Sequence, residues 1–170
     1  QRAFFEPRAP EELFDLVTDP DNVRNLAADP AHRSTLERLR AANRAHLLRI
    51  RDTGFLPEPM MVALSGGASP TTLTASETAY PLARLLDFID ACQLGTATPA
   101  EITAGTQDPL AVVRFWAITA PLARASAPAP SVLFNDSDPS VRLAAATSAL
   151  LHGSNDSVAL GVVADSLSPQ

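Results

Sequence analysis

The sequence predicts a mainly α-helical protein with an α+β segment at its N-terminal end, and three observations lead to this prediction. Residues 31–51 and 81–92 carry apolar side chains at helical spacing. Two alanine-rich stretches with similar sequences begin 28 residues apart, at Val113 and Val141. Two short apolar runs near the N-terminus are bounded by prolines or Asp-Pro breaks. We therefore expect short antiparallel strands and a long helix, followed by α-helical repeats.

Composition excludes several classes of function. The chain has 170 residues, 46% of them hydrophobic, which is enough for a packed core. Its formal net charge is −6, so it lacks the basic field that nucleic acids or anionic membranes attract. No segment has the unbroken apolar length of a membrane span. We expect no nucleic-acid or membrane partner, and we expect any targeting segment to precede Gln1, which is not a natural start.

Two strands are expected before the first long helix. Residues 2–5 form an apolar run that Pro7 and Pro10 end. Residues 13–17 form the second run. Because two strands alone are marginally stable in water, we expect them to join a sheet whose other strands precede Gln1.

A long helix is expected over residues 31–51. Asp29 can accept a backbone N–H bond as its N-cap, and Pro30 suits the first helical position. Its apolar stripe consists of Leu36, Leu39, Leu47 and Ile50, with Ala42 and Ala45 filling part of the gap. After it, residues 55–59 should be extended, because two prolines restrict the residues that precede them.

The middle of the chain is expected to be a linker. Residues 65–78 are rich in Ser, Thr and Gly and carry few apolar side chains. The predicted organisation is therefore a first domain over residues 1–58, a linker over residues 59–80, and helical repeats over residues 81–170.

The repeat region begins with two helices that the sequence predicts clearly. The first follows Pro81, with apolar positions at Leu82, Leu85, Leu86 and Ile89 and with Phe88 and Cys92 beside them. Thr98 and Glu101 form a capping box at the start of the second. Cys92 is the single cysteine, which excludes an internal disulfide and a multi-cysteine metal site. Its apolar neighbours indicate a buried structural thiol rather than a nucleophile.

The repeat itself consists of two copies, residues 113–123 and 141–151, each of which follows an Asp-Pro pair. Arg114 aligns with Arg142, and the other matching pairs are Val113 and Val141, Ala117 and Ala145, Thr119 and Thr147, and Leu122 and Leu150. Shorter apolar pieces follow the copies, at residues 131–134 and 158–167. Each copy thus predicts a capped, alanine-rich helix and a second short helix, as in an α-solenoid.

Three side chains of the repeats carry specific predictions. Trp116 should fill the gap left by the small side chains of Ala117 and Ala120. Arg114 and Arg142 should bond carboxylates of neighbouring turns rather than a ligand.

The first third of the chain resembles the C-terminal end of the formylglycine-dependent sulfatases. Four sequence motifs occur in the order found in that family: EELFDL at residues 11–16, DPDNVRNLA at residues 19–27, DPAHRSTLERLR at residues 29–40 and RDTGFLPEP at residues 51–59. The later copies resemble HEAT-like repeats, although 28 residues is shorter than the usual period and Pro121 interrupts the first copy. In sulfatases with this kind of tail, such repeats often follow the last of the four motifs.

The resemblance implies a sulfatase whose nucleophile and metal site lie upstream of this chain. Sulfatases make a formylglycine from Cys or Ser within a Cys/Ser-x-Pro-Ser/Ala-Arg motif, which the residues around Cys92 do not match. The family's calcium ligands have no counterpart here, and His32, His46 and His152 lack metal-ligand spacing. No catalytic, cofactor-binding or metal residue is therefore assigned. Ca²⁺ and formylglycine are expected in an upstream catalytic domain, and export to the periplasm or the cell exterior is expected by the same resemblance.

The basic face of the long helix leaves two interpretations open. It consists of Arg33, Arg38, Arg40, Arg44, Arg49 and Arg51. It could be an anion-binding face for sulfated sugars, or a solvated face with carboxylate partners upstream, and the pattern favours the second.

Two functions from different classes follow. The leading hypothesis is a non-catalytic C-terminal portion of a sulfatase that hydrolyses sulfate esters or sulfamates of sugar or aryl substrates, with the upstream catalytic domain as its partner. The alternative is a helical-repeat protein-interaction module without enzymatic activity, with a protein partner at the repeats. The carboxylate pairs Asp87/Asp90 and Asp136/Asp138 are interpreted as caps and solvated faces rather than an acid/base couple.

Overall fold

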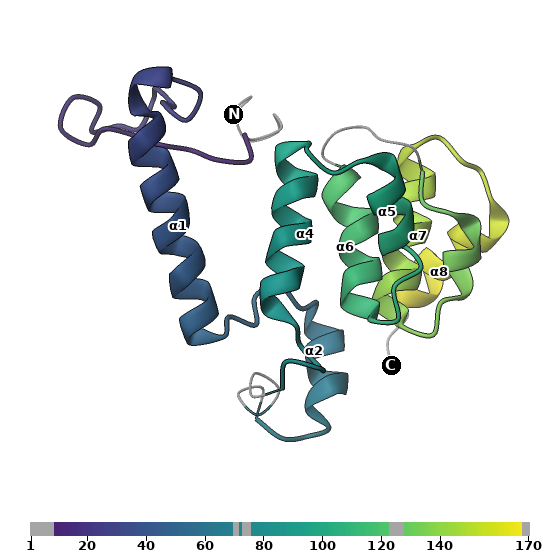
Figure 1. Cartoon of the computed structure of the whole chain (residues 1–170). Coiled ribbons are helices and arrows are strands. Elements are labelled where there is room, and N and C mark those ends of the chain that lie inside the picture. Colours follow the sequence, from purple (N-terminus) through teal and green to yellow (C-terminus); the bar gives the residue numbers. More distant parts are fainter. Residues whose placement is uncertain (1–8, 70–71, 73–75, 123–127, 168–170) are drawn as a thin grey trace. The chain divides into compact units, whose positions relative to one another are not determined.

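Residues 9–69, 72, 76–122 and 128–167 are described by the computed structural model of this chain (Figure 1). Across these residues the protein has seven α-helices, two 3₁₀ helices and no strand. The mainly helical prediction is therefore confirmed. None of the described helices combines the length and apolar character needed to cross a membrane.

The chain divides into two compact units, Gln1–Asp52 (unit 1) and Thr53–Gln170 (unit 2). The boundary thus precedes the predicted one, which followed residue 58. The first predicted strand, residues 2–5, lies outside the described residues.

The second strand, predicted over residues 13–17, is wrong, and the α+β segment is therefore not supported. Residues 16–18 form a turn that the carboxylate of Asp15 closes. This carboxylate accepts from the N–H of Val17 at 3.0 Å and from the hydroxyl of Thr18 at 2.9 Å. Val17 is 90% exposed as a result. An aspartate inside a short apolar run thus offers the backbone a local turn in place of a strand.

The side chain of Asn25 replaces the neighbouring strand that this segment was expected to have. Its amide oxygen accepts from the N–H of Leu13, and its amide nitrogen donates to the carbonyl oxygen of Glu11, both at 2.9 Å. The N–H of Leu26 donates to the carbonyl oxygen of Leu13 at 2.7 Å. These bonds satisfy backbone groups that would otherwise need a sheet.

The rest of unit 1 is the helix α1 (Arg33–Ile50), preceded by the 3₁₀ helix η2 (Pro30–His32). Asp29 caps this start as predicted, because its carboxylate accepts from the N–H of Ala31 at 2.9 Å. The helix ends at Ile50, and its C-cap residue Arg51 has a left-handed φ of 55°.

The apolar stripe of α1 is only partly covered. The helix has no buried residue, and Leu39 and Ile50 are 43% and 47% exposed. Leu26 is the single buried hydrophobic residue among the described residues of unit 1. The described part of unit 1 therefore has almost no core of its own.

The segment after residue 52 belongs to unit 2 and soon becomes helical, which corrects both the predicted linker and the extended stretch. α2 (Glu58–Ser65) begins inside that region, with Pro59 in its first turn. A proline is tolerated there because the first N–H groups of a helix have no intrahelical acceptor. Leu56 and Met60 are 7% and 3% exposed, so this segment packs against unit 2.

Three long helices carry the core of unit 2. They are α4 (Leu82–Leu94), α6 (Ala111–Leu122) and α7 (Pro139–Leu151). Each is followed by a shorter element, namely α5 (Pro99–Gly105), the 3₁₀ helix η3 (Ser131–Asn135) and α8 (Ser157–Ser166). α6 packs against both α4 and α7, and α7 packs against α8 (Figure 1). The predicted second short helix is thus a 3₁₀ helix after the first copy, and α6 continues past Pro121 for one residue.

The helix starts follow the sequence signals. Thr98 and Glu101 form the predicted capping box, in which the Thr98 N–H donates to the Glu101 carboxylate at 2.7 Å. Asp138 caps α7 and Asp156 caps α8, each by accepting backbone N–H bonds in the first turn. The four apolar positions predicted for α4 are all buried.

The packing around Ala117 differs from the prediction. Gly105 of α5 approaches so closely that a Cβ atom there would lie 2.7 Å from Phe88 and 2.9 Å from Ala117. The gap left by Ala117 is therefore filled by the α5 backbone and not by Trp116. The Trp116 ring turns instead towards Phe55, with the ring centroids 6.3 Å apart.

Candidate functional site

Among the side chains of types that could support catalysis, His46 and His152 contact residues three or four positions away in the chain, and Cys92 is buried. No group of three or more His, Cys, Asp or Glu side chains in the described ranges could hold a metal ion. The His152 ring bonds the carbonyl oxygen of Ser148 at 2.7 Å, and the His46 ring contacts the guanidinium of Arg49 at 2.9 Å. Cys92 is buried as predicted, and burial raises the pKa of its thiol. It is therefore a neutral core side chain near neutral pH.

A buried ion pair joins Arg114, in the first turn of α6, to Asp136, which follows η3. The arginine Nε and Nη2 atoms donate to the two carboxylate oxygens at 2.7 and 2.8 Å. The two side chains are only 13% and 6% exposed. Nη1 also donates to the carbonyl oxygens of Asp108 and Pro109, at 2.7 and 3.1 Å. The prediction that Arg114 bonds a carboxylate of a neighbouring turn is confirmed.

Asp136 is therefore not the solvated carboxylate that was predicted. Burial alone would raise its pKa, but bonds from Arg114 and from the N–H of Asp138 outweigh burial and hold the pKa below the ordinary 3.8. In turn, the bond to Asp136 raises the pKa of Arg114. Both groups stay charged inside unit 2 at neutral pH.

An equivalent pair precedes it in the chain. Arg84, in the first turn of α4, forms an ion pair with Asp108, whose side chain is 7% exposed. Asp108 also accepts from the N–H of Leu110 at 2.9 Å, as Asp136 does from the N–H two residues later. We refer to Arg84, Arg114 and Arg142, with the aspartates they bond, as the arginine ladder.

Arg142, in the first turn of α7, reproduces only half of the geometry of Arg114. Its Nη1 donates to the carbonyl oxygens of Asp136 and Ser137, at 2.8 and 3.2 Å. Within the described part of the chain, no carboxylate forms a hydrogen bond or an ion pair with it. Among the described residues the prediction that Arg142 bonds a carboxylate is therefore not met, although its charge helps to lower the pKa of Asp136. Its Nε and Nη2 make no hydrogen bond to these residues.

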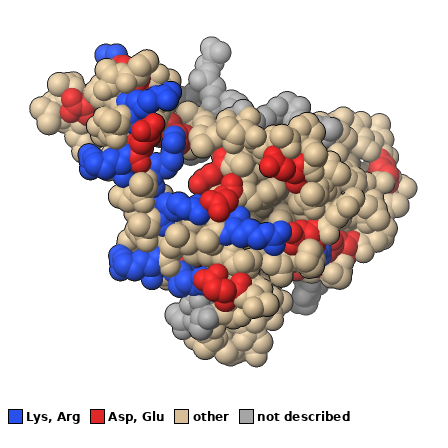
Figure 2. All heavy atoms as spheres, viewed as in Figure 1, with Lys and Arg blue, Asp and Glu red and all other residues tan. Residues whose placement is uncertain are grey.

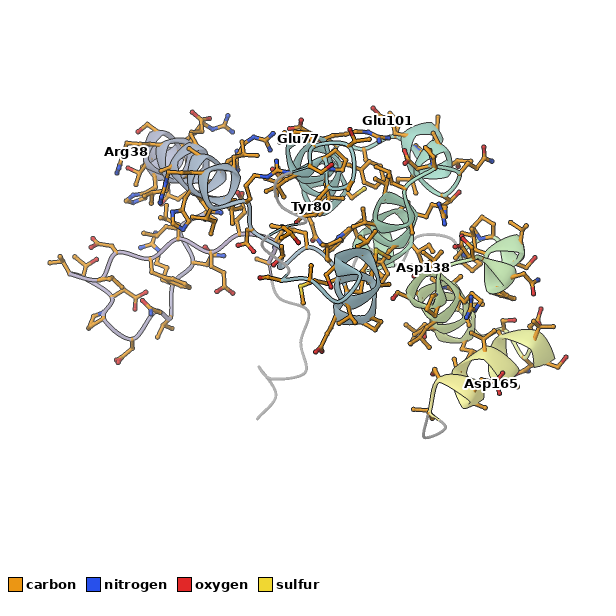
Figure 3. All side chains as sticks on the ribbon, turned by 90° about the horizontal axis from the view of Figure 1, so that it is seen from below. Arg38, Glu77, Tyr80, Glu101, Asp138 and Asp165 are labelled. Atoms are coloured by element: carbon orange, nitrogen blue, oxygen red, sulfur yellow. The ribbon has the colours of Figure 1, made fainter. Side chains whose placement is uncertain are left out.

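Arg142 lines a cavity of about 640 Å³ in unit 2. Its walls come from α6, α7, α8 and the start of α2, and its apolar lining includes Phe115, Leu143 and Val162. Asp165 lines it from α8, and Figure 3 shows Asp165 on this helix and Asp138 at the start of α7. The hydroxyl of Ser140 is buried in the wall without a hydrogen-bond partner. We refer to this space as the Arg142 cavity.

The arginines of α1 form the other charged feature, and Figure 2 shows basic side chains along this helix. Arg40 bonds the Glu11 carboxylate with both Nε and Nη2 at 2.6 Å, and this bond lowers the pKa of Glu11. For Arg40, a carboxylate upstream is thus the partner, as the favoured interpretation expected. Arg33 and Arg40 also line a pocket of about 240 Å³ with Glu11 and Glu37. The two carboxylates make this pocket unsuited to a sulfated ligand.

Sequence reasoning missed the acidic half of the ladder. Asp108 was read as part of an Asp-Pro break and Asp136 as a cap. The alignment of Arg114 with Arg142 places Asp108 opposite Asp136, and this register could have identified both as partners of the arginines. Asp165 was not singled out at all.

No protein-family model, no curated protein and no solved structure matches this chain. The arginine ladder and the Arg142 cavity are therefore interpreted from their own geometry.

Proposed function

We propose that this chain is the non-catalytic C-terminal portion of a formylglycine-dependent sulfatase, ending in HEAT-like repeats. The proposal starts from the four sequence motifs of unit 1 and the segment that follows it, which occur in the order found in that family. The parent enzyme would hydrolyse sulfate esters or sulfamates of sugar or aryl substrates.

The structural observation that supports the proposal is the lack of a core among the described residues of unit 1. Among the described residues of unit 1, Leu26 is the single buried hydrophobic residue, which is too little to stabilise a unit of this size, and α1 leaves Leu39 and Ile50 exposed. Such a unit needs a larger body to pack on. An upstream catalytic domain would supply this surface.

The residues present do not fit the cofactors of a sulfatase. Cys92 is a buried thiol with a raised pKa, and the described residues offer no cluster of three carboxylate, histidine or cysteine ligands. The proposal therefore places formylglycine and Ca²⁺ in the upstream domain and assigns no step of the hydrolysis to this chain.

A second candidate function is a protein-interaction module built on the helices of unit 2. The observation that favours it is the Arg142 cavity, where a half-buried arginine has, among the described residues, no hydrogen-bonded carboxylate of the kind that Arg84 and Arg114 each have. The matching bonds of Arg114 and Arg142, 28 residues apart, support the HEAT-like description of this unit.

The sequence upstream of Gln1 separates the two candidates. A Cys/Ser-x-Pro-Ser/Ala-Arg pentapeptide some hundreds of residues earlier is expected for a sulfatase, and its absence would leave the module. The isolated chain should also hydrolyse no aryl sulfate and bind no stoichiometric Ca²⁺, measured by release of the phenol and by calorimetry. Turnover by the purified chain that a substitution within it abolishes would contradict the proposal.

A further inference from the structure

We propose that the Arg142 cavity binds an aspartate-bearing turn of a partner protein, in the way that Arg114 binds the turn around Asp136. This inference rests on the second candidate function, the interaction module, and specifies its site and the chemistry of its ligand. It does not depend on the sulfatase proposal.

The chain itself supplies the template for the ligand. The turn that Arg114 holds has two apolar side chains, Leu133 and Phe134, which are 7% and 4% exposed, and Asp136 follows after one further residue. Burial of the apolar pair and bidentate pairing of the carboxylate occur together there. A ligand for Arg142 should therefore combine apolar side chains with an aspartate two residues later.

The cavity offers the same two kinds of contact. Arg142 is anchored by Nη1 on two carbonyl oxygens, as Arg114 is, which leaves Nε and Nη2 for a carboxylate. Phe115 and Leu143 supply apolar walls, and about 640 Å³ is ample for two apolar side chains. The geometry thus fits an apolar, acidic turn better than an inorganic anion.

The partner is a different protein rather than a second copy of this chain. In every molecule of this protein the turn around Asp136 is already buried under Arg114. It could bind the cavity of a second molecule only if unit 2 opened. A second copy also carries this pattern at Leu16-Val17-Thr18-Asp19, but there both oxygens of the Asp19 carboxylate already accept from the N–H groups of Val23 and Arg24. We therefore take the ligand to be an exposed turn of this kind on a different protein.

Asp165 is the competing carboxylate that the test must address. It lies 23 residues after Arg142, close to the separations of 24 and 22 residues in the two filled pairs. It lines the same cavity from α8 but is exposed and does not bond Arg142. Removing its charge should therefore strengthen the binding of an acidic turn, because a like charge at the cavity wall is lost.

The experiment uses the whole 170-residue chain and a fluorescent, end-blocked peptide with the sequence of residues 131–139, SVLFNDSDP. Anisotropy titrations at low salt should give saturable binding. Arg142→Gln should weaken it at least tenfold, Arg142→Lys should weaken it less, and Asp165→Asn should strengthen it severalfold. Arg38→Gln, an equal charge change on the exposed face of α1, is the matched control and should leave the dissociation constant unchanged.

One arm does not rely on the folding of an Arg142 variant. The peptide with asparagine in place of its first aspartate, SVLFNNSDP, should bind at least tenfold more weakly to the wild-type chain. Circular dichroism melting would establish that each protein variant is folded at the titration temperature.

Several outcomes would overturn the inference. They are no saturation at millimolar peptide, equal binding to wild type and a folded Arg142→Gln variant, or equal binding of the two peptides. Binding that appears only after Asp165→Asn would show that Arg142 and Asp165 pair with each other and close the cavity, which also overturns it. None of these results decides between the sulfatase proposal and the module proposal, which the sequence upstream of Gln1 tests separately. A failure of this inference is therefore distinguishable from a failure of the proposed function.

Discussion

The indole N–H of Trp116 donates a hydrogen bond to the carbonyl oxygen of Phe55, 2.8 Å away and 61 residues earlier in the chain. The rings of the two residues also contact each other, and the Phe115 ring meets Trp116 edge-on at 5.8 Å. A buried indole N–H needs an acceptor, and a carbonyl of the exit segment provides it. This contact is why the segment after residue 52 belongs to unit 2.

Trp116 substitutions should separate the ring from the hydrogen bond. Trp116→Ala should lower the free energy of unfolding by about 3 kcal/mol, the low end for such a truncation because the side chain is only half-buried. Trp116→Phe keeps a ring and loses the N–H, so about 1 kcal/mol is expected. Urea unfolding followed by circular dichroism measures both. Equal losses in the two variants would show that ring packing contributes little.

Breaking the buried ladder pair should be costly. Arg114→Gln leaves the Asp136 carboxylate buried without its cation, so the free energy of unfolding should fall by about 3–5 kcal/mol. Arg84→Gln is the control, because the Arg84 side chain is 56% exposed and water screens the pair, so about 1 kcal/mol is expected. Chemical unfolding of both variants tests this order, and a larger loss at Arg84 would contradict it.

The same pair predicts how stability depends on pH. The pKa of Asp136 is lower in the folded protein than its ordinary value of 3.8, so its contribution is complete above pH 3.8. That contribution is lost as the pH falls below 3.8 through the folded pKa, because the folded state must then bind the proton. Melting temperatures between pH 5 and pH 2 should therefore fall less steeply for Asp136→Asn than for wild type. Parallel slopes would mean that other carboxylates govern acid unfolding.

Two glycine substitutions should have opposite signs. Gly105→Ala places a Cβ atom 2.7 Å from Phe88 and 2.9 Å from Ala117, so the overpacked core should lose about 1–3 kcal/mol. Gly161→Ala, inside α8 with nothing within 4 Å, should gain about 0.5–1 kcal/mol from helix propensity. Thermal melting compares them, and stabilisation by Gly105→Ala would show that Phe88 moves aside freely.

The parts of the fold that the sequence predicted are those that local chemistry decides. Asp29, Thr98 and Asp138 cap helices because a short side chain reaches a backbone N–H two or three residues away. The buried face of α4 follows from helical spacing alone. Such features depend on no distant residue.

The parts it did not predict are decided by distant partners. At residues 13–17 the local turn of Asp15 replaces a strand, but the backbone of Leu13 finds its partner in the amide of Asn25, 12 residues away. The gap at Ala117 is closed by Gly105, which a one-dimensional pattern cannot place. At the candidate site, Asp136 and Asp138 look alike in sequence, and only the approach of Arg114 makes one a buried ion and the other a cap.

The arginine ladder points forward along the chain, and this direction has a consequence during synthesis. Arg84 and Arg114 leave the ribosome 24 and 22 residues before the aspartates that neutralise them. Until Asp136 has emerged, α6 cannot bury Arg114 without an unpaired cation in its interior. Nascent chains that end before residue 136 should therefore hold α6 as a hydrated, protease-accessible helix, although domains generally fold as they emerge. Unit 2 can therefore bury α6 only once Asp136, which lies just before α7, has left the ribosome.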